Sequence, residues 1–439
     1  MSPSSSILPS RDGAVATIDA FLAETIPALV PAPDELPRRG RPTILPSVCL
    51  WGGLLVCVLQ GFSAQLALWR LLTDKGLWHY PRFAVSDQCI YSRLAQEGIG
   101  PLVTLFSAIS QILAERLAPF AASDLAPFAT EVMALDQTTL DTIARRLPAL
   151  RALPPKDAGL LGGTLSGLFD LRRQQWRQVL YEEDAAANEK RHARDLLPDL
   201  PVGSLLLADL GYFGFAWFDD LTDAGYHWIS RLREKTSYRV IHTYYQRGDT
   251  FDGIIELGAY RADRTKHAVR LVTFRHKTTT YRYITNVRDP QQLAIRQIAQ
   301  LYARRWDFEL AVNLIKTHLG LHLLWSGKPV VIQQQIDAVL IIAQILQAFR
   351  LEIAGRAGVD PFEVSLPLMI QYLPQYAARG LDPIPAFLEN ARFLRFIRPS
   401  TRTIIHAPDI PPDRIVPLPP DLVLERPPRY AQRRCSPAS

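Results

Sequence analysis

Hydrophobic residues recur along the chain with two different periods, and the change from one to the other divides the sequence. From Leu45 to about Phe128 the apolar residues repeat with the spacing of α-helices, about 3.6 residues per turn. From Glu131 onward, short apolar runs predict β-strands, and the first of them, EVMALD, ends at Asp136. The pattern therefore predicts a helical N-terminal region followed by a region built on a sheet.

The N-terminal region contains one helix with clear end signals. The stretch VSDQCIYSRLAQEG predicts a helix capped by Ser86 and closed by Gly98. Such a region is typical both of a small DNA-binding domain and of a helical packing module, and the residues leave both open. Residues 1–45 are rich in Ser, Pro and Arg and predict a loose basic arm. Its PRRGRP segment (37–42) resembles arms that bind the minor groove, although the composition favours an ordinary solvated linker.

Strands and helices alternate after Glu131. Residues 159–184 predict two or three strands, and a polar helix follows over residues 184–197. The run SLLLADLGYFG predicts a strand ending at Asp209, followed by a helix from Phe213 to Ala224 and the strand YHWISRL. Residues 235–287 are rich in Tyr, Thr, Arg and Val with almost no helical period, and predict a set of inserted strands. This order predicts an α/β fold with a mixed sheet surrounded by helices.

A late helix carries an unusual polar stripe. The stretch LYARRWDFELAVNLIKTHLG (301–320) predicts a helix that is apolar on two sides. At about 100° per residue, four polar side chains fall within roughly 60° of one another: Tyr302, Arg305, Glu309 and Lys316. A buried carboxylate flanked by cations is either a structural ion-pair network or a functional site. The spacing alone leaves both interpretations open.

Length, charge and cysteine content narrow the class of protein. A chain of 439 residues is long enough for two or more domains. The formal net charge is +6, which points to a polyanionic partner because arginine suits phosphate groups. The four cysteines form no C-x-x-C pair, which argues against a zinc ribbon or disulfide scaffold and fits a reducing cytoplasm. The start of the sequence predicts no signal peptide, and the apolar stretches 48–59 and 339–349 predict core helices of a soluble protein rather than membrane spans.

Three acids have the placement of a metal site. Asp136 and Asp209 each end a predicted strand, and if the two strands are neighbours both carboxylates lie at one edge of the sheet. Glu309 on the late helix then approaches as a third. Three close carboxylates repel one another unless cations neutralise them. Magnesium suits such a site because it prefers hard oxygen ligands and also accepts phosphate oxygens.

These residues resemble the DDE-type transposases of bacterial insertion sequences, in the group marked by the motif Y-(2)-R-(3)-E-(6)-K. Every gap of that motif is present in the late helix. The block ALDQTTLD is similar to the family's first acidic strand, although Gln137 stands where a smaller residue is commoner. LADLGYFG resembles its D-x-G-[YF] signature through Asp209, Gly211 and Tyr212, and YITN (283–286) resembles the strand before the catalytic helix.

The resemblance implies an RNase H-like catalytic core interrupted by a β-rich insertion. The expected domains are a basic Pro/Ser-rich arm (1–45), a helical N-terminal domain (46–128), the first part of the core (129–234), the insertion (235–288), the second part of the core with the catalytic helix (289–356), and a C-terminal helical and Pro/Arg-rich tail (357–439). It also implies that Asp136, Asp209 and Glu309 are the catalytic metal ligands. They would hold two Mg²⁺ ions, with Mn²⁺ as a substitute.

The resemblance also implies DNA contacts. Tyr302, Arg305 and Lys316 are expected to hold phosphates of the strand beside the scissile bond. Tyr281 is the first candidate, with Tyr283 second, for an aromatic ring that stacks on a base drawn out of the duplex. Two structural alternatives stay open: Tyr281 packs on its sheet, and Arg305 forms an i, i+4 ion pair with Glu309 that steadies the helix.

Other chemistry-bearing residues fit the site less well. His318 and His322 have the spacing of a zinc pair but no Glu between them, and Gly320 is expected to end the helix there. Asp307 points about 160° away from Glu309 at helical spacing. Asp219, Asp220 and Asp223 are expected on a solvated helix face.

The predicted function is that of a cut-and-paste DNA transposase. It would bind terminal inverted repeats as a dimer on double-stranded DNA, cleave the strands with metal ions and join them to target DNA, acting at the nucleoid in the cytoplasm and away from membranes. One alternative is a decayed or domesticated copy that occupies inverted repeats without cutting them. Another is an RNase H-like nuclease without sequence preference.

Overall fold

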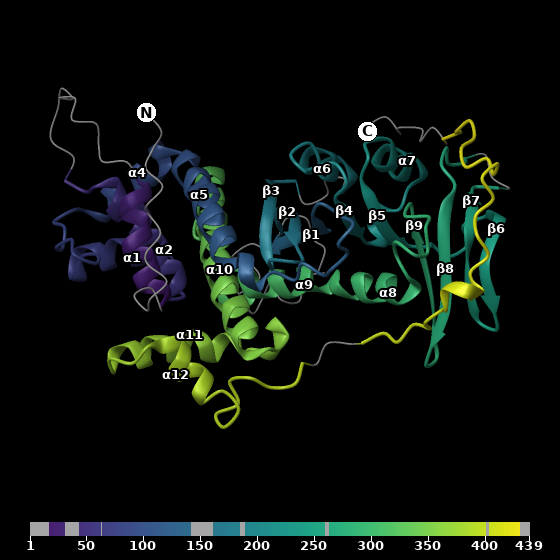
Figure 1. Cartoon of the computed structure of the whole chain (residues 1–439). Helices are drawn as coiled ribbons and strands as arrows, with labels where there is room; N and C mark the ends of the chain where they lie inside the picture. Colours follow the sequence, from purple (N-terminus) through teal and green to yellow (C-terminus); the bar gives the residue numbers. More distant parts are fainter. Residues whose placement is uncertain are drawn as a thin grey trace, which may run out of the picture.

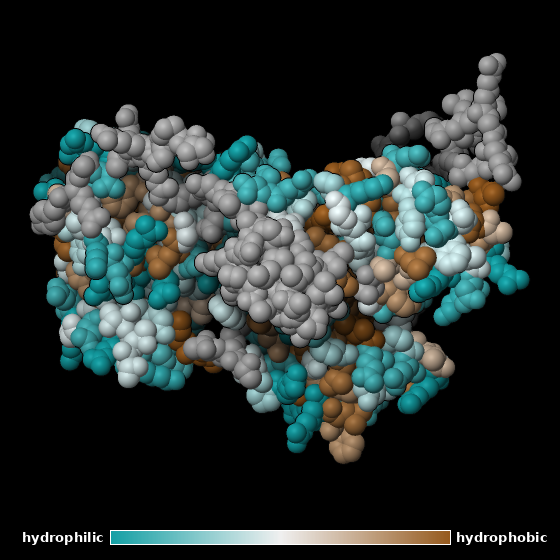
Figure 2. Space-filling view, turned by 180° about the vertical axis from the view of Figure 1, so that it is seen from behind, coloured by the Kyte–Doolittle hydropathy of each residue, from teal (hydrophilic) through white to brown (hydrophobic). Residues whose placement is uncertain are grey.

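The computed structural model describes residues 17–30, 44–62, 64–141, 161–184, 189–259, 263–400 and 404–430. Helices gather at one end of the molecule and a large sheet at the other, with the long helix α10 (Pro329–Ala357) between them (Figure 1). Seen from behind, hydrophilic and hydrophobic residues alternate over the described surface (Figure 2). The two ends share a continuous apolar core, which runs from the N-terminal helices through α10 to one face of the sheet.

The N-terminal part is helical, as the periodicity predicts. Ser86 caps α4 through a hydrogen bond from the Cys89 backbone N–H to its Oγ (3.3 Å), and Gly98 ends the helix with a φ of +68°. The helices here are α1 (Ile18–Leu29), α2 (Ser47–Leu59), α3 (Gln65–Arg70), the π-helix η1 (Leu71–Lys75), α4 (Asp87–Glu97), α5 (Gly100–Leu117) and the short η2 (Ala118–Phe120).

The expectation of a loose arm over residues 1–45 is wrong for its middle part. Helix α1 lies within that range, and one side of it is buried in the core. Its buried residues are spaced at three and four positions, the period of an amphipathic helix: Ile18, Phe21, Leu22 and Ile26. The overall Ser, Pro and Arg content hides this short pattern. The PRRGRP segment lies outside the described residues.

Within the described part of the chain, nine strands form one mixed sheet in the order β3-β2-β1-β4-β5-β9-β8-β7-β6. Strands β1, β2 and β3 pair antiparallel, whereas β4 and β5 run parallel to β1. This five-stranded arrangement is the RNase H-like core that was expected, and the α/β fold class is confirmed. The strands are β1 (Val132–Asp141), β2 (Leu161–Asp170), β3 (Gln175–Glu182), β4 (Leu205–Ala208), β5 (His227–Arg231), β6 (Tyr238–Arg247), β7 (Thr250–Leu257), β8 (Val269–His276) and β9 (Thr279–Thr285).

The strands predicted over residues 235–287 are present as β6 to β9, and they extend the core sheet rather than forming a separate one. Strand β9 pairs antiparallel with β5, with Ile229 opposite Thr285. Strand β5, the outermost strand of the core, and β9, its neighbour in the added half, therefore share backbone hydrogen bonds. Figure 1 shows the two halves as one continuous, twisted sheet.

Helices cover both faces of the core sheet. Strand β1 therefore directs apolar side chains alternately to the two faces. Met133 and Leu135 pack with α6 (Glu189–Leu196) and α7 (Phe215–Asp223). Val132 and Ala134 belong to the core on the other face, which includes α8 (Ile295–Arg304), α9 (Trp306–Asn313) and α10. A strand buried on both faces reads as a continuous apolar run, as EVMAL does.

Helix α10 is long and apolar enough to cross a membrane, but 89% of its most apolar window is buried inside the protein. Gln344 on this helix bonds the backbone of Trp176 on β3, and Gln334 bonds the carbonyl groups of Leu94 and Gly98. These glutamines tie α10 to both the sheet and the N-terminal helices. The sequence expectation of a core helix agrees with this packing.

The C-terminal part has two pieces. Helices α11 (Leu366–Ala378) and α12 (Pro383–Glu389) pack beside α10. Residues 404–430 then cross to the far half of the sheet and lie along it (Figure 1). There the Ala268 N–H donates to the Leu424 carbonyl (2.8 Å), and the Arg426 side chain pairs with Glu256 (3.1 Å).

Candidate active site

Two of the three predicted acids lie on neighbouring parallel strands, Asp136 within β1 and Asp209 directly after β4. The expectation that the first strand ends at Asp136 is wrong, because β1 continues to Asp141 through its pairing with β2. In the register of β1 and β4, Leu135 lies opposite Ala208, so that Asp136 and Asp209 come next on each strand. The expectation that these two strands are neighbours is confirmed. Their carboxyl groups lie at the same edge of the sheet because the strands run in the same direction.

The third acid lies on a helix that is less regular than predicted. The stretch expected as one helix over 301–320 is divided into the end of α8, then α9, then a π-helical turn, η7 (Leu314–His318). Arg305, at the junction of α8 and α9, keeps right-handed helical dihedrals (φ −53°, ψ −33°). Gly320 follows η7 with a φ of +75°, which supports its predicted role at the end of the helix.

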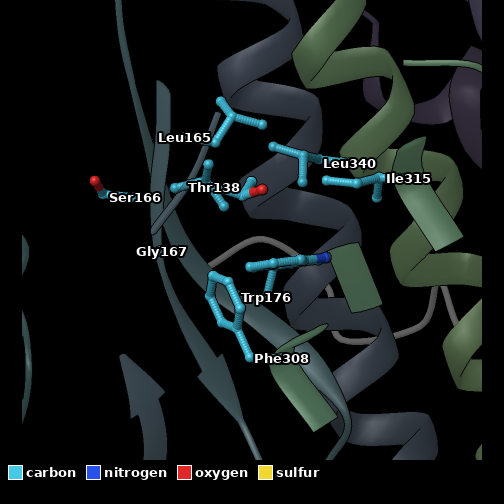
Figure 3. Close-up of a pocket in the computed structure, with 9 residues that line it drawn as sticks. Thr138, Leu165, Ser166, Gly167, Trp176, Phe308, Ile315 and Leu340 are labelled. Atoms are coloured by element: carbon cyan, nitrogen blue, oxygen red, sulfur yellow. The ribbon is translucent and has the colours of Figure 1, made fainter. Parts of the chain in front are cut away.

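Aromatic packing seats α9 on the sheet and thereby directs Glu309. The Phe308 ring is buried and meets Trp176 of β3 edge-on, with ring centroids 5.1 Å apart. Figure 3 shows both rings among other, mainly apolar, side chains from the sheet, the helices and η7, including Leu165, Ile315 and Leu340. The small space they line is too narrow for a water molecule. It is a packing region behind the acids rather than a ligand pocket.

Several charged groups of the site act on the carboxyl group of Asp136. Burial raises the pKa of its carboxyl group to about 6 from its ordinary value of 3.8. The Arg305 guanidinium and the Gln137 backbone N–H (2.9 Å) oppose that rise, whereas the carboxylates of Glu309 and Asp209 add to it. The three acids therefore lie within electrostatic reach of one another.

Arg305 pairs across the site rather than along its own helix. Its Nη1 contacts Oδ2 of Asp136, with only 12% and 14% of the two side chains exposed. In the described residues no Arg305–Glu309 ion pair is found, so the alternative of an i, i+4 pair is wrong for this structure. Arg305 therefore offsets only part of the negative charge around Asp136, because Glu309 and Asp209 act on the same group.

The other members of the polar stripe reach the same two strands. The Tyr302 hydroxyl lies 3.5 Å from both the Ala208 carbonyl and Oδ1 of Asp209, and burial raises its pKa well above the usual range. Lys316 Nζ donates to Oγ1 of Thr138 (2.7 Å) on β1 and contacts the Thr139 carbonyl. All four stripe residues therefore face the edge that carries Asp136 and Asp209, as their helical spacing predicts.

Tyr281 lies on β9, one strand beyond β5, and is half-buried. Its ring stacks on Phe274 at a centroid distance of 5.5 Å and on Tyr283 at 6.1 Å. Tyr283 in turn contacts the ring of Tyr302 (4.9 Å). This packing matches the structural alternative for Tyr281, and its role in base stacking stays a prediction.

Sequence reasoning missed two exposed residues, Arg231 at this edge and Trp306 on the late helix. Arg231 ends β5, is exposed, and its positive charge acts on the hydroxyls of Tyr302 and Tyr283. Trp306 follows Arg305 directly, and 57% of its surface is exposed. The signal for Arg231 was available, since it ends a strand parallel to the two that carry the acids.

The competing acids lie elsewhere. Asp307 is fully buried and pairs with Arg304 (3.1 Å), as expected for a residue that points away from Glu309. The expectation of a solvated face is wrong for Asp219, which is 2% exposed. Its carboxylate accepts from the backbone N–H groups of Lys266 (2.7 Å) and His267 (3.1 Å), partners far away in sequence.

The three acids are of the kind that suits a hard divalent cation, because carboxylate oxygens are the ligands that such ions prefer. Among the described residues, no three or more His, Cys, Asp or Glu side chains converge closely enough to form a ready metal-binding group. Asp136 is instead engaged by Arg305. The chemistry of the three acids thus fits Mg²⁺, and the arrangement described is one in which an arginine partly neutralises them.

A comparison with known protein families matches part of this chain. Residues 164–345 match the sequence model of the family described as "Transposase DDE domain". This stretch includes Asp209 and Glu309 and begins after Asp136. This part of the chain is therefore similar to a transposase DDE domain, and the resemblance expected from the motifs is confirmed.

Among solved structures, the chain is similar to a piggyBac transposase in a synaptic complex with hairpin DNA, determined by cryo-electron microscopy. The two share 10% sequence identity with a TM-score of 0.41, over 88% of this chain and 82% of that chain. None of the curated proteins matches the sequence.

Proposed function

We propose that the protein is a cut-and-paste transposase of a bacterial insertion sequence, which excises its element and joins it to target DNA. The observation that carries the proposal is that Asp136, Asp209 and Glu309, from two parallel strands and one helix, lie within electrostatic reach of one another, with Asp209 and Glu309 inside the stretch that matches a transposase DDE domain. Acids from separate elements rarely converge with so little neutralising charge unless they have a function.

The three acids are proposed as ligands of two Mg²⁺ ions, with Mn²⁺ as a substitute. When bound, such ions activate a water and stabilise the leaving oxygen of a phosphodiester. Arg305 is proposed to change partners when metal and DNA bind. Once its guanidinium leaves Asp136, the carboxylate is free to hold metal and the guanidinium is free to grip a phosphate with its bidentate fork.

The remaining stripe residues are proposed to position the DNA strand. Tyr302 donates toward Asp209, and Lys316 supplies a point charge further along the helix. Arg231, exposed at the end of β5, adds a cation whose charge acts on Tyr302. We include it with Tyr302, Arg305 and Lys316 among the phosphate-binding residues.

Two aromatic side chains are candidates for stacking on a displaced base. Tyr281 was proposed from the sequence, but its ring already packs on Phe274 and Tyr283. Trp306 is more accessible and adjoins Arg305 on the catalytic helix. An exposed indole beside a phosphate-binding residue suits stacking on any base.

The proposed partners are double-stranded DNA ends with terminal inverted repeats and a target duplex, bound by a dimer at the nucleoid in the cytoplasm. The helical region 46–128 is proposed to contribute to DNA binding. The formal net charge of the whole chain, +6, supports a polyanionic partner.

A cleavage assay tests the proposal. Purified protein is incubated with Mg²⁺ and a labelled duplex that ends in the inverted repeat flanking its reading frame. A scrambled-end duplex is the control. We expect nicking at the repeat boundary and joining of the freed 3′ ends to a plasmid.

The three other outcomes separate the alternatives. Specific binding without cutting identifies a silent inverted-repeat-binding protein. Equal cutting of both duplexes identifies a nuclease without sequence preference. Failure to bind or cut either duplex contradicts the proposed function altogether.

A further inference from the structure

The two C-terminal helices end in a tight projecting turn. After α12, Ala391 and Phe396 are both buried, whereas the four residues between them are exposed. We refer to these residues, 392–395, as the RFLR turn. The segment after α12 forms the lowest projection of the molecule in Figure 1, and the same projection carries both hydrophilic and hydrophobic residues in Figure 2.

The base of the RFLR turn is firmly anchored. The Phe396 ring stacks on Phe387 of α12 at a centroid distance of 4.4 Å and an interplanar angle of 13°. The Phe396 carbonyl accepts a hydrogen bond from the Ser365 N–H (2.8 Å), and Ile397 forms a β-bridge with Val364. These contacts fix the turn against the start of α11, so the side chains at its tip are held out in a defined direction.

Phe393 at the tip is the most exposed large apolar side chain in the described part of the protein. Some 87% of its surface is open to solvent. Arg395, two residues on, has a φ of +55°, a left-handed conformation that costs free energy for a residue with a Cβ. Keeping a strained backbone and an exposed phenyl ring together on a rigid base is costly unless the turn has a partner.

The surroundings of Phe393 are basic. Arg392, Arg395 and Arg398 are all exposed, and no acidic residue occurs from Asn390 to Ser400. In the residues that the structure covers, none of these three guanidinium groups has a hydrogen bond or an ion pair, unlike Arg304 and Arg305 in the catalytic domain. Three unpaired cations around an apolar tip complement a polyanion better than an apolar protein surface.

We propose that the RFLR turn binds duplex DNA, with Phe393 wedged against a base step in the minor groove and the arginines on the flanking phosphates. Apolar wedges of this kind bend DNA toward the major groove, and nearby cations bind the phosphates as the groove opens. The inference rests on the proposed function and deepens it. It assigns a second DNA contact, on helices that lie apart from the sheet and its acids (Figure 1).

Binding and bending measurements on the full chain test this contact. The probe is a mixed-sequence duplex of about 30 base pairs that carries a dye at each end, titrated at several salt concentrations. Phe393→Ser should weaken binding about 10-fold and lower the bend reported by energy transfer between the dyes. Phe393→Leu should retain most of the bend because leucine also serves as a wedge.

The role of the arginines is tested by the salt dependence of DNA binding. The double variant Arg392→Ala/Arg395→Ala should reduce the slope of log affinity against log salt by about 2, since each lost phosphate contact lowers it by about 0.9. Arg379→Ala, an exposed arginine at the end of α11, and Val423→Ser, an exposed apolar residue in the C-terminal segment, are the matched controls. Both should leave the slope and the bend unchanged.

The possible failures are distinguishable. If wild-type protein cuts its repeat ends but the RFLR variants bind and bend DNA normally, the turn is not a DNA contact and the proposed function stands. If the variants change the oligomeric state and leave DNA binding intact, the turn is a protein interface and the inference is wrong. If wild-type protein binds no duplex at all, both proposals fail. Unchanged melting temperatures would show that the variants fold.

Discussion

Two buried arginine–aspartate pairs in this protein have opposite characters. In the added half of the sheet, Arg270 and Asp252 are 0% and 1% exposed and form two hydrogen bonds of 2.7 Å, and Arg270 also donates to the Leu293 carbonyl (2.6 Å). At the candidate active site, Arg305 reaches Asp136 through one nitrogen while two further carboxylates act on the same group.

The difference separates a structural pair from a functional one. Arg270 binds both oxygens of Asp252 and a backbone carbonyl, and the pair is closed off from solvent, so the two charges neutralise each other within the core. Asp136 is left with a raised pKa and with two acidic neighbours, so the arginine neutralises only part of the local charge. The burial of an ion pair alone therefore says little about function, whereas the balance of charges around it says more.

The largest effect should come from removing an acid of the candidate site. Asp136→Ala, Asp209→Ala and Glu309→Ala should each slow strand cleavage by at least about 1,000-fold, because metal-assisted charge stabilisation contributes several kcal/mol. Binding to repeat ends should persist, since it rests on basic residues. Cleavage is measured on labelled ends and binding by gel shift.

Asp307→Asn is the control for those three variants. This acid is buried on the same helix but pairs with Arg304 outside the site. The variant should lose stability yet still cut DNA at low temperature. Mg²⁺-dependent cutting that survives the loss of one site acid would remove that residue from the assignment.

The structural pair should show the reverse behaviour. Asp252→Ala leaves the Arg270 charge buried without its partner and should lower the free energy of unfolding by about 3–5 kcal/mol. Well below its melting temperature the variant should cut DNA normally. Denaturant unfolding and cleavage at low temperature check the two halves of this expectation. A folded variant with no cleavage would mean that this pair also serves the reaction.

Asp337 on α10 extends the comparison to a partly buried carboxylate for which no arginine partner is found in the described part of the chain. Burial raises its pKa from 3.8 to about 7, so the folded protein binds this proton more tightly than the unfolded chain does. Stability from this group is complete below pH 3.8 and is lost as the pH rises toward 7. Asp337→Asn should therefore be more stable than wild type at pH 8, by up to about 4 kcal/mol, and no more stable at pH 4. Melting temperatures of the variant and of wild type at pH 4 and pH 8 test this expectation. An equal difference between the two proteins at both pH values would contradict the raised pKa of Asp337.

The smallest effects should come from the phosphate-positioning residues. Arg305→Ala and Lys316→Ala should nick the first strand at a moderately reduced rate and fail by a further 10- to 100-fold, roughly 1.4–2.7 kcal/mol, at second-strand cleavage or strand transfer. Positioning matters most once the DNA is bent or a base is displaced. Single-turnover rates for each step provide the measurement. Uniform slowing together with a lower melting temperature would instead assign these residues to helix stability.

The sequence predicted those features that depend on local pattern. The fold class, the neighbouring strands that carry Asp136 and Asp209, and the polar stripe of the late helix all follow from period and spacing. It did not predict the π-helical turn η7, because that turn depends on the backbone, where the Leu319 N–H bonds the Leu314 carbonyl (3.0 Å), rather than on side-chain spacing.

Tertiary contacts explain the other errors. Asp219 has the spacing of a solvated helix residue, yet its partners are the backbone of Lys266 and His267 and the hydroxyl of Tyr430 (2.8 Å). The pairing of Arg305 with Asp136 rather than Glu309 likewise joins residues 169 positions apart. No local period carries information about partners so distant along the chain.

The continuity of the nine-stranded sheet has a further consequence, for solubility. Without the strands between residues 238 and 285, β5 would present a row of unpaired backbone groups beside the acids, an open edge that recruits other chains. The added strands move that edge outward to β6, which is interrupted by two irregularities in its register, carries exposed Arg239 and Arg247, and has the C-terminal segment bonded to it through Val416 and Tyr244 (2.9 Å). Bulges, charges and a covering segment are the ordinary means by which proteins protect an edge from aggregation. Deleting these strands would therefore cost the protein its protection against self-association as well as a part of its sheet.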